Sequence, residues 1–241
     1  MPVALRYAAR SDIGLGRYKN NQDSGYAGPH LLAVCDGMGG HAAGDVASSV
    51  ALGELVALDG ESHGGDALQQ LDATIHAANA ALQSRVRAEP DLAGMGTTTT
   101  ALVLHGQRIA LAHIGDSRCY LLRGGRLQRL TRDQTMTQML VDAGVMPPEA
   151  LHSHHMRHML TQAMGKGEVV IDAQHLPLRD GDRLMLSSDG LTDGVSDEQI
   201  LDMLSRGDCD AACGELMHAA LEAGGRDNVT VIVADVSLQA E

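Results

Sequence analysis

The sequence predicts an α+β fold in which β-sheets are flanked by α-helices as layers of one sandwich. Three observations predict it. The expected elements follow one another as strands, two helices, strands, two helices and a strand. Hydrophobic residues make up 44% of the 241 residues, which is enough for a packed core without any Phe or Trp. The chain has no internal repeat, so we expect a single domain over residues 1–241.

The first half of the chain supplies strands and then two helices. Residues 4–9 and the apolar run 31–35 have the pattern of short strands. A Gly-rich stretch leads from the second strand into a helix over about 45–58. A second helix is indicated by apolar residues at steps of three and four between Leu68 and Val86, before Pro90.

The second half returns to strands and closes with helices and a strand. Three strands are expected to form an antiparallel meander, with hairpin turns at Gly106-Gln107 and Gly124-Gly125; they span 98–105, 108–114 and 117–122. Residues of about 135–165 are predicted to be an inserted flap over this meander. The remaining elements are a strand over 183–187, helices over 197–205 and 209–223, and a strand over 228–236.

Composition excludes several classes of function. The chain carries 18 Lys and Arg against 31 Asp and Glu, a net charge of −13, which disfavours nucleic-acid binding. Its apolar runs are too short for a membrane span, and its first ten residues lack a secretory pattern. The four cysteines lack the spacing of a zinc site. We therefore expect a cytoplasmic monomer with no nucleic-acid or membrane partner.

Several aspartates stand where strands begin or end, namely Asp36, Asp116, Asp189 and Asp227. Strand ends present side chains to a shared cleft, and carboxylates that converge there repel one another. Divalent cations relieve that repulsion, and oxygen ligands favour Mg²⁺ or Mn²⁺. The alternative is ordinary turn chemistry, because Asp-Gly occurs five times in the chain. The pattern alone leaves both interpretations open.

Eight stretches, in order between Ser11 and Val233, resemble the metal-dependent protein phosphatases of type 2C, the PPM family, and specifically its compact bacterial members. They are SDIGLGRYKNNQDS, AVCDGMGGHAAGDVAS, GMGTTTTAL, AHIGDSRCYLLRGG, LTRDQT, LTQAMG, LMLSSDGLTDGV and GGRDNVTVIV. The resemblance implies a four-layer sandwich of two central antiparallel β-sheets flanked by helices. It also implies a serine/threonine protein phosphatase with two Mn²⁺ or Mg²⁺ ions and a third, weaker one.

The resemblance implies roles for particular residues. Asp36 would bridge two metal ions, and the Gly37 carbonyl would be a further ligand. Asp189 and Asp227 would bind the second ion, and Asp116 with Asp189 the third. The phosphate would be gripped by Arg17, and Asp23 would position the water. The hydroxide that bridges the metal ions would attack phosphorus in line, without a phospho-enzyme. Asn228 would orient Asp227 or cap the last strand, and no catalytic role is expected for the threonines that follow Gly96.

Three positions depart from the family pattern. Met38 stands where many members have a histidine that is a candidate general acid, and methionine cannot donate a proton. Gln22 replaces a glutamate beside Asp23, which removes a charge near the metals. The segment RDQT lacks the histidine that often follows its aspartate. His154 and His158 in the flap are spaced to share a metal ion, but a polar flap surface is the preferred interpretation.

Three functions are considered for a chain with these motifs. The first is a phosphatase of phosphoserine and phosphothreonine in proteins that opposes a bacterial Ser/Thr kinase, in a pathway such as type VI secretion with a forkhead-associated protein as partner. The second is an inactive binding module, which should have lost one of Asp36, Asp189 or Asp227; all three are present. The third keeps the metal centre but acts on a partner-switching regulator or a small phosphoester.

Overall fold

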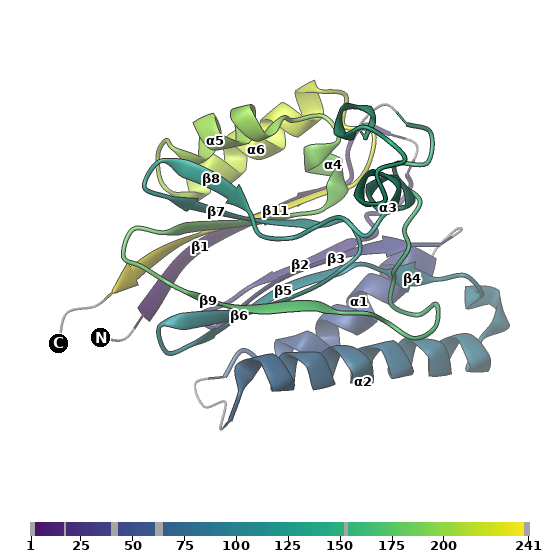
Figure 1. The fold of residues 1–241 in the computed structure, drawn as a ribbon. Helices are drawn as coiled ribbons and strands as arrows, with labels where there is room; N and C mark the ends of the chain where they lie inside the picture. Colours follow the sequence, from purple (N-terminus) through teal and green to yellow (C-terminus); the bar gives the residue numbers. More distant parts are fainter. Residues whose placement is uncertain (1–2, 17, 40–42, 61–64, 152–153, 239–241) are drawn as a thin grey trace.

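The computed structural model describes residues 3–16, 18–39, 43–60, 65–151 and 154–238. Its strands form two antiparallel sheets stacked face to face, with helices on both outer faces (Figure 1). This arrangement confirms the predicted α+β sandwich of four layers. Within the described residues, no helix is long and apolar enough to cross a membrane.

The five-stranded sheet joins the two ends of the chain. Its strands lie in the order β1 (Val3–Asp12), β11 (Val229–Leu238), β10 (Arg183–Ser187), β7 (Arg118–Arg123) and β8 (Arg126–Arg129). The first and last strands of the protein pair along their whole length, from Val3 opposite Leu238 to Asp12 opposite Val229. The strand β1 therefore joins the rest of this sheet only through β11.

The second sheet contains strands between Asp23 and Ile114 and one later strand, β9 (Asp172–Pro177). Its order is β2 (Asp23–Ala27), β3 (Leu31–Met38), β5 (Thr99–His105), β6 (Arg108–Ile114) and β9, and the short β4 (Gly96–Thr97) pairs with the end of β3. Because all pairs are antiparallel, β3 and β6 end at the same edge of the sandwich at which β2 begins.

The core follows from the two-residue period of the strands. On β3, Leu31, Ala33 and Cys35 face the helices, whereas Leu32 and Val34 face the other sheet. The space between the sheets is filled by aliphatic residues and the buried Cys119, as expected of a chain without Phe or Trp. All four cysteines are buried and free.

Helices cover both outer faces, and the four longest helices of the described residues lie at the predicted places. The six-stranded sheet carries α1 (Ala43–Val56) and α2 (Ala67–Ala88), and the other carries α4 (Asp189–Thr192), α5 (Asp197–Leu204) and α6 (Cys209–Glu222). Their starts follow from capping. Asp66 accepts a hydrogen bond from Leu68 N at 2.9 Å, and Ser196 forms a capping box with Gln199.

The predicted meander is wrong in one respect. The strands β5 and β6 form a hairpin through Gly106-Gln107, but the third strand, β7, lies in the other sheet, where it pairs with β10 and β8. The turn at Gly115, with φ +105°, carries the chain from one sheet to the other. Both β6 and β7 are buried on both faces, so their apolar pattern identifies strands without identifying partners.

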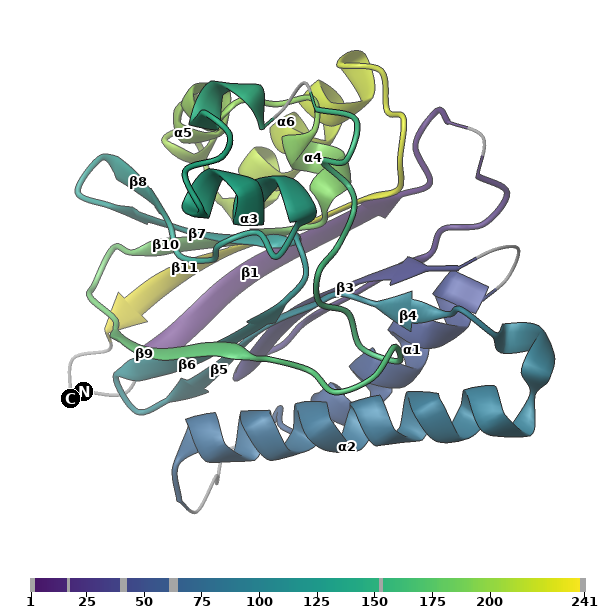
Figure 2. The ribbon, with the colours of Figure 1, turned by 45° about the vertical axis from the view of Figure 1, so that its right-hand side comes forward.

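The flap over residues 135–165 contains α3 (Met136–Asp142) and a short 3₁₀ turn, η2 (Pro148–Ala150). Two isolated bridges hold it: Thr135 with Leu160 joins the two ends of the flap to each other, and Thr97 with Met164 joins its end to β4. Figure 2 shows the chain after the flap crossing from the side of α4 to β4. The flap thus passes over the strand ends that carry the predicted aspartates.

Candidate functional site

A cleft of about 960 Å³ opens at the edge where β3, β6 and β10 end and β11 begins. Its floor is acidic, because five aspartates line it: Asp36, Asp116, Asp189, Asp193 and Asp227. Four of these were predicted as ligands, together with Gly37, which also lines the cleft. The strand ends therefore converge as the sequence indicated.

Asp36 and Asp23 are neighbours across two strands. They are directly opposed partners of β3 and β2, so their side chains emerge on the same face. Asp36 N–H donates to Thr98 Oγ1 at 2.9 Å, and Ser188 Oγ donates to Asp23 Oδ2 at 2.7 Å. Asp23 is not among the lining residues of the cleft and lies beside Asp36 on the neighbouring strand.

The other three predicted carboxylates come from three connections. Asp116 is buried in the turn between β6 and β7, and Asp189 is the first residue of α4, directly after β10. Asp227 precedes β11, and its Oδ1 accepts a hydrogen bond from Asn228 N at 2.7 Å. Tyr18 OH, which also lines the cleft, lies 3.5 Å from Asp227 Oδ2. Each carboxylate is thus held by the end of a regular element.

Close approach of main chains explains the glycine beside Asp36. A Cβ on Gly37 would lie 2.0 Å from Gly44 O and 2.6 Å from Gln22 O, so no larger residue fits. Gly37 N donates to Gln22 O at 3.1 Å. The Gly37 main chain therefore lies at the cleft. Its carbonyl oxygen is the only atom of this residue that can act as a metal ligand.

Burial and mutual repulsion raise the pKa values of these carboxyls. Burial raises the pKa of Asp36 and of Asp116 well above the ordinary value, and neighbouring aspartates add to it. Burial raises the pKa of Asp23 to about 7, against the opposing effect of the Ser188 hydroxyl. The pKa of Asp227 is raised by burial and then by Asp189. Full ionisation of these carboxyls therefore requires a compensating positive charge.

The donor set fits divalent cations. Asp189 Oδ1 is buried and has no hydrogen-bond partner among the residues that the structure describes. A buried carboxylate oxygen without a partner is costly, and a cation at this point would satisfy it. The converging ligands are oxygens, as Mg²⁺ and Mn²⁺ prefer. The residues present are thus suited to hold such ions.

Basic residues also line the cleft. Arg17, the predicted phosphate ligand, lies outside the described residues. Arg157, Lys166 and Arg226 line the cleft, and the sequence reasoning missed all three. Two of them could have been found from the sequence, because Lys166 directly follows the stretch LTQAMG and Arg226 directly precedes Asp227.

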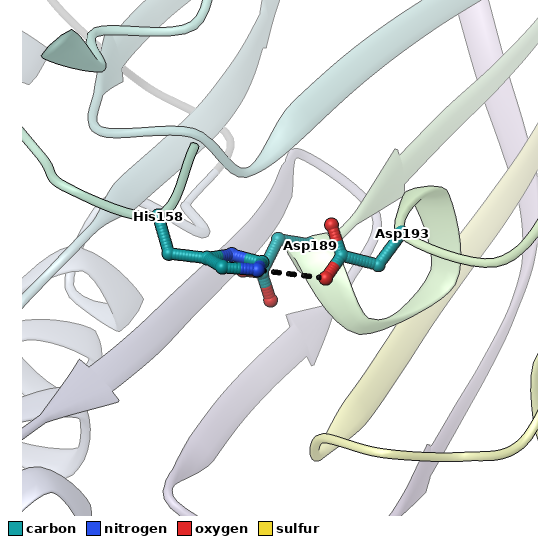
Figure 3. A group of neighbouring side chains, drawn as sticks. All are labelled: His158, Asp189 and Asp193. Atoms are coloured by element: carbon teal, nitrogen blue, oxygen red, sulfur yellow. Dashed lines mark ion pairs between the residues drawn. The ribbon is translucent and has the colours of Figure 1, made fainter. Parts of the chain in front are cut away.

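The flap contacts the acidic floor through His158 (Figure 3). Its Nδ1 lies 3.3 Å from Asp189 Oδ2, and its Nε2 lies 3.3 Å from Asp193 Oδ2. Among the described residues, these three form the one group of His, Cys, Asp or Glu side chains whose ligand atoms all lie within 4.8 Å of one another. The hydrogen bond to Asp189 raises the pKa of His158. Both nitrogens face carboxylates, which suits the doubly protonated ring.

The flap histidines do not share the arrangement considered from their spacing. His154 stacks on His155 with ring centroids 4.4 Å apart, while His158 turns to the floor. The preferred interpretation of a polar flap surface stays a prediction, and the exposed His158 has in Asp189 and Asp193 the carboxylate partners that the flap sequence lacks. Asp193 was missed as a cleft residue, although it follows Asp189 by four residues and so shares its helical face.

Asn228 contacts Asp227 through its main chain and a neighbouring loop through its side chain. Its Oδ1 accepts from Gln22 N at 2.7 Å, and its Nδ2 donates to Ile13 O at 2.9 Å. Only its backbone N–H contacts Asp227. The Asn228 side chain therefore bonds both ends of the segment 13–22 and holds them together. This segment contains the position of Arg17.

Comparison with known proteins identifies the family. Residues 8–139 match the model of the family described as protein phosphatase 2C. The chain belongs to the protein phosphatase 2C family. Within this family it is 52% identical, over 97% of its length, to the serine/threonine protein phosphatase PstP of Mycobacterium tuberculosis, strain H37Rv. The chain spans 45% of the length of that relative.

Other protein phosphatase 2C relatives match over their full length. The chain is 32% identical to the serine/threonine phosphatase stp of Listeria monocytogenes, strain EGD-e, over 95% of each. Among solved structures, the catalytic domain of PstP in complex with two manganese ions has a TM-score of 0.92 at 50% identity, covering 98% of this chain and 100% of that one. PppA, described as a key regulatory component of T6SS in Pseudomonas aeruginosa, has a TM-score of 0.83 at 32% identity, covering 97% and 99%.

Proposed function

We propose that residues 1–241 form one phosphatase domain that hydrolyses phosphoserine and phosphothreonine in proteins with the help of Mn²⁺ or Mg²⁺. The observation that carries the proposal is the convergence of Asp36, Asp116, Asp189 and Asp227 in one cleft of a protein phosphatase 2C fold. The relatives named above are protein phosphatases, and one of them binds two manganese ions.

The proposed ligands are the four cleft aspartates and the Gly37 carbonyl. Asp36 would serve two ions, Asp189 and Asp227 the second, and Asp116 with Asp189 a third and weaker one. Bound divalent cations supply a water of lowered pKa and neutralise phosphate oxygens. The raised pKa values of Asp36 and Asp116 and the unpartnered Asp189 Oδ1 support this assignment.

The chain's own residues would bind and orient the substrate. Arg17 would grip two phosphate oxygens in bidentate geometry, and Asp23 would position the attacking water. The new P–O bond forms in line with the ester bond that breaks, and the leaving serine or threonine oxygen takes up a proton. Asp23, with a pKa near 7, is suited to hold or accept a proton at neutral pH. Met38 lines the cleft but cannot supply the leaving-group proton.

The proposed partners follow the same family relationship. We expect phosphorylated proteins as substrates, an opposing bacterial Ser/Thr kinase and a forkhead-associated protein. The likeness to PppA supports a role in type VI secretion. We further expect the domain to be a cytoplasmic monomer. The alternative of an inactive module is not favoured, because none of the metal-binding carboxylates is replaced.

The test is phosphate release from a phosphothreonine peptide. Protein treated with EDTA should be inactive, and added Mn²⁺ should restore activity that resists okadaic acid. The Asp36→Asn variant, folded by circular dichroism, is the control for contaminating phosphatases. A folded wild-type protein that binds Mn²⁺ but releases no phosphate from several phosphopeptides would contradict the proposed activity.

A further inference from the structure

A buried threonine joins the two segments that carry Asp36 and Asp116. Thr98 lies between β4 and β5 and is 1% exposed. Its Oγ1 accepts the N–H of Asp36 at 2.9 Å and lies 2.8 Å from Ser117 Oγ. Its N–H donates to Asp36 O at 2.8 Å. One residue thus contacts the main chain of one proposed ligand and the neighbour of another.

One of these hydrogen bonds has a fixed direction. The amide of Asp36 can only donate, so Thr98 Oγ1 accepts there, whereas either hydroxyl can be the donor between Thr98 Oγ1 and Ser117 Oγ. The result is a chain of two bonds that runs from the end of β3 to the turn between β6 and β7. Both hydroxyls are buried, so water does not compete for them.

The methyl group of Thr98 contacts the other side of the same turn. A Cβ on Gly115 would lie 2.6 Å from Thr98 Cγ2, and Gly115 has φ +105°. The side chain of Thr98 therefore contacts both residues that flank Asp116, through its methyl on Gly115 and through its hydroxyl on Ser117. Asp116 cannot shift relative to Asp36 without breaking one of these contacts.

We infer that Thr98 is a positioning residue that sets the spacing between the carboxylates of Asp36 and Asp116, and thereby the affinity of the cleft for the cation at Asp116. The inference rests on the proposed function. Cations of this kind accept ligands only within a narrow range of distances, so a displaced carboxylate binds poorly. Groups that orient ligands without touching the metal change its affinity by about 10- to 100-fold.

The test measures Mn²⁺ binding to metal-free protein by electron paramagnetic resonance of the free ion. Thr98→Val keeps the shape and removes the hydroxyl, and we expect the weakest Mn²⁺ site to lose about tenfold in affinity. Thr98→Ser, which keeps the hydroxyl, should recover most of that loss. Thr99→Val is the matched control, because the Thr99 hydroxyl is also buried but bonds Thr98 O and Met164 Sδ instead.

A double-mutant cycle separates positioning from a general structural effect. In the Asp116→Asn background, Thr98→Val should change Mn²⁺ binding by less than about twofold, because the residue through which it acts is gone. Ser117→Ala removes the far end of the same chain of bonds and should resemble Thr98→Val, which keeps the test open if that variant does not fold.

Two results would overturn the inference. One is wild-type Mn²⁺ binding in both folded Thr98→Val and Ser117→Ala; the other is an equal loss in Thr98→Val with or without Asp116. Wild-type protein that binds no Mn²⁺ at all would instead contradict the proposed function, on which the inference depends.

Discussion

Asp23 and Asp36 are directly opposed on neighbouring antiparallel strands, and both carboxyls have raised pKa values. Two carboxyls on one face of a sheet repel each other, and like charges in this position destabilise strand pairing. The protein tolerates this arrangement at the end of β3, where the Asp36 N–H donates to Thr98 Oγ1 and the Asp36 carbonyl accepts from the Thr98 N–H. The hydrogen bonds at the end of β3 thus offset the repulsion between these two carboxyls.

The first prediction concerns pH. The folded pKa of Asp23, about 7, exceeds the unfolded value of about 4, so the folded state binds more protons in that window. The contribution of this group to stability is therefore present at low pH and is lost as pH rises from about 4 through 7. Thermal unfolding of EDTA-treated protein should show it, and Asp23→Asn should flatten the slope relative to wild type. Identical slopes would contradict the pKa assignment.

The second prediction separates the proposed metal ligands. Asp36→Asn should lower turnover by about 1000-fold or more, because several kcal/mol of charge stabilisation depend on it. Asp116→Asn should lower turnover less and leave the tightly bound Mn²⁺ in place. Phosphopeptide kinetics and Mn²⁺ binding check both variants. Wild-type turnover in Asp36→Asn, or loss of all bound metal in Asp116→Asn, would contradict the assignments.

The third prediction concerns Asn228, which closes the segment 13–22. Asn228→Ala leaves the Gln22 N–H and the Ile13 carbonyl without this partner, which should cost about 1–3 kcal/mol in the free energy of unfolding. Because the segment contains Arg17, the KM for a phosphopeptide should rise more than kcat falls. Urea unfolding and steady-state kinetics measure the two effects. A destabilised variant with unchanged KM would remove Asn228 from substrate binding.

The fourth prediction concerns the contact between flap and floor. Asp193 faces both Arg157, at 3.6 Å, and His158, at 3.3 Å. Partly exposed ion pairs are worth about 0.2–1 kcal/mol, so Asp193→Asn should speed tryptic cleavage after Arg157 by at most about fivefold. Cleavage at Arg87, at the end of α2, is the internal control. Equal rates at Arg157 in both proteins would show that the pair does not hold the flap.

The fold could be predicted where strands are buried and could not where they are polar. The strand β10, Arg183–Ser187, has the predicted bounds because an apolar run stands between turn residues. The edge strand β9, Asp172–Pro177, was missed because it is exposed and polar and contains a proline. The partner of β7 could not be predicted, since a two-residue period identifies a strand but not the sheet to which it belongs.

The site shows the same limit. Of the Asp-Gly pairs, those at Asp36, Asp189 and Asp193 line the cleft, whereas Asp59 accepts hydrogen bonds from the N–H groups of His30 and Leu31, at the start of β3. Local spacing does not distinguish them, because the difference depends on which strand ends meet in space. The resemblance to a family supplied that information, and it did not extend to His158, whose partners come from a distant helix.

The pairing of β1 with β11 has a practical consequence for handling the protein. Val3 and Leu238 are partners at one end of this ribbon, and Asp12 and Val229 are partners at the other, beside Asp227 and the cleft. Ten residues of strand span about 30 Å. An attachment made beside Val3 or Leu238 therefore lies at the end of the ribbon away from the cleft, and an immobilised protein of this kind presents its cleft outward to large substrates.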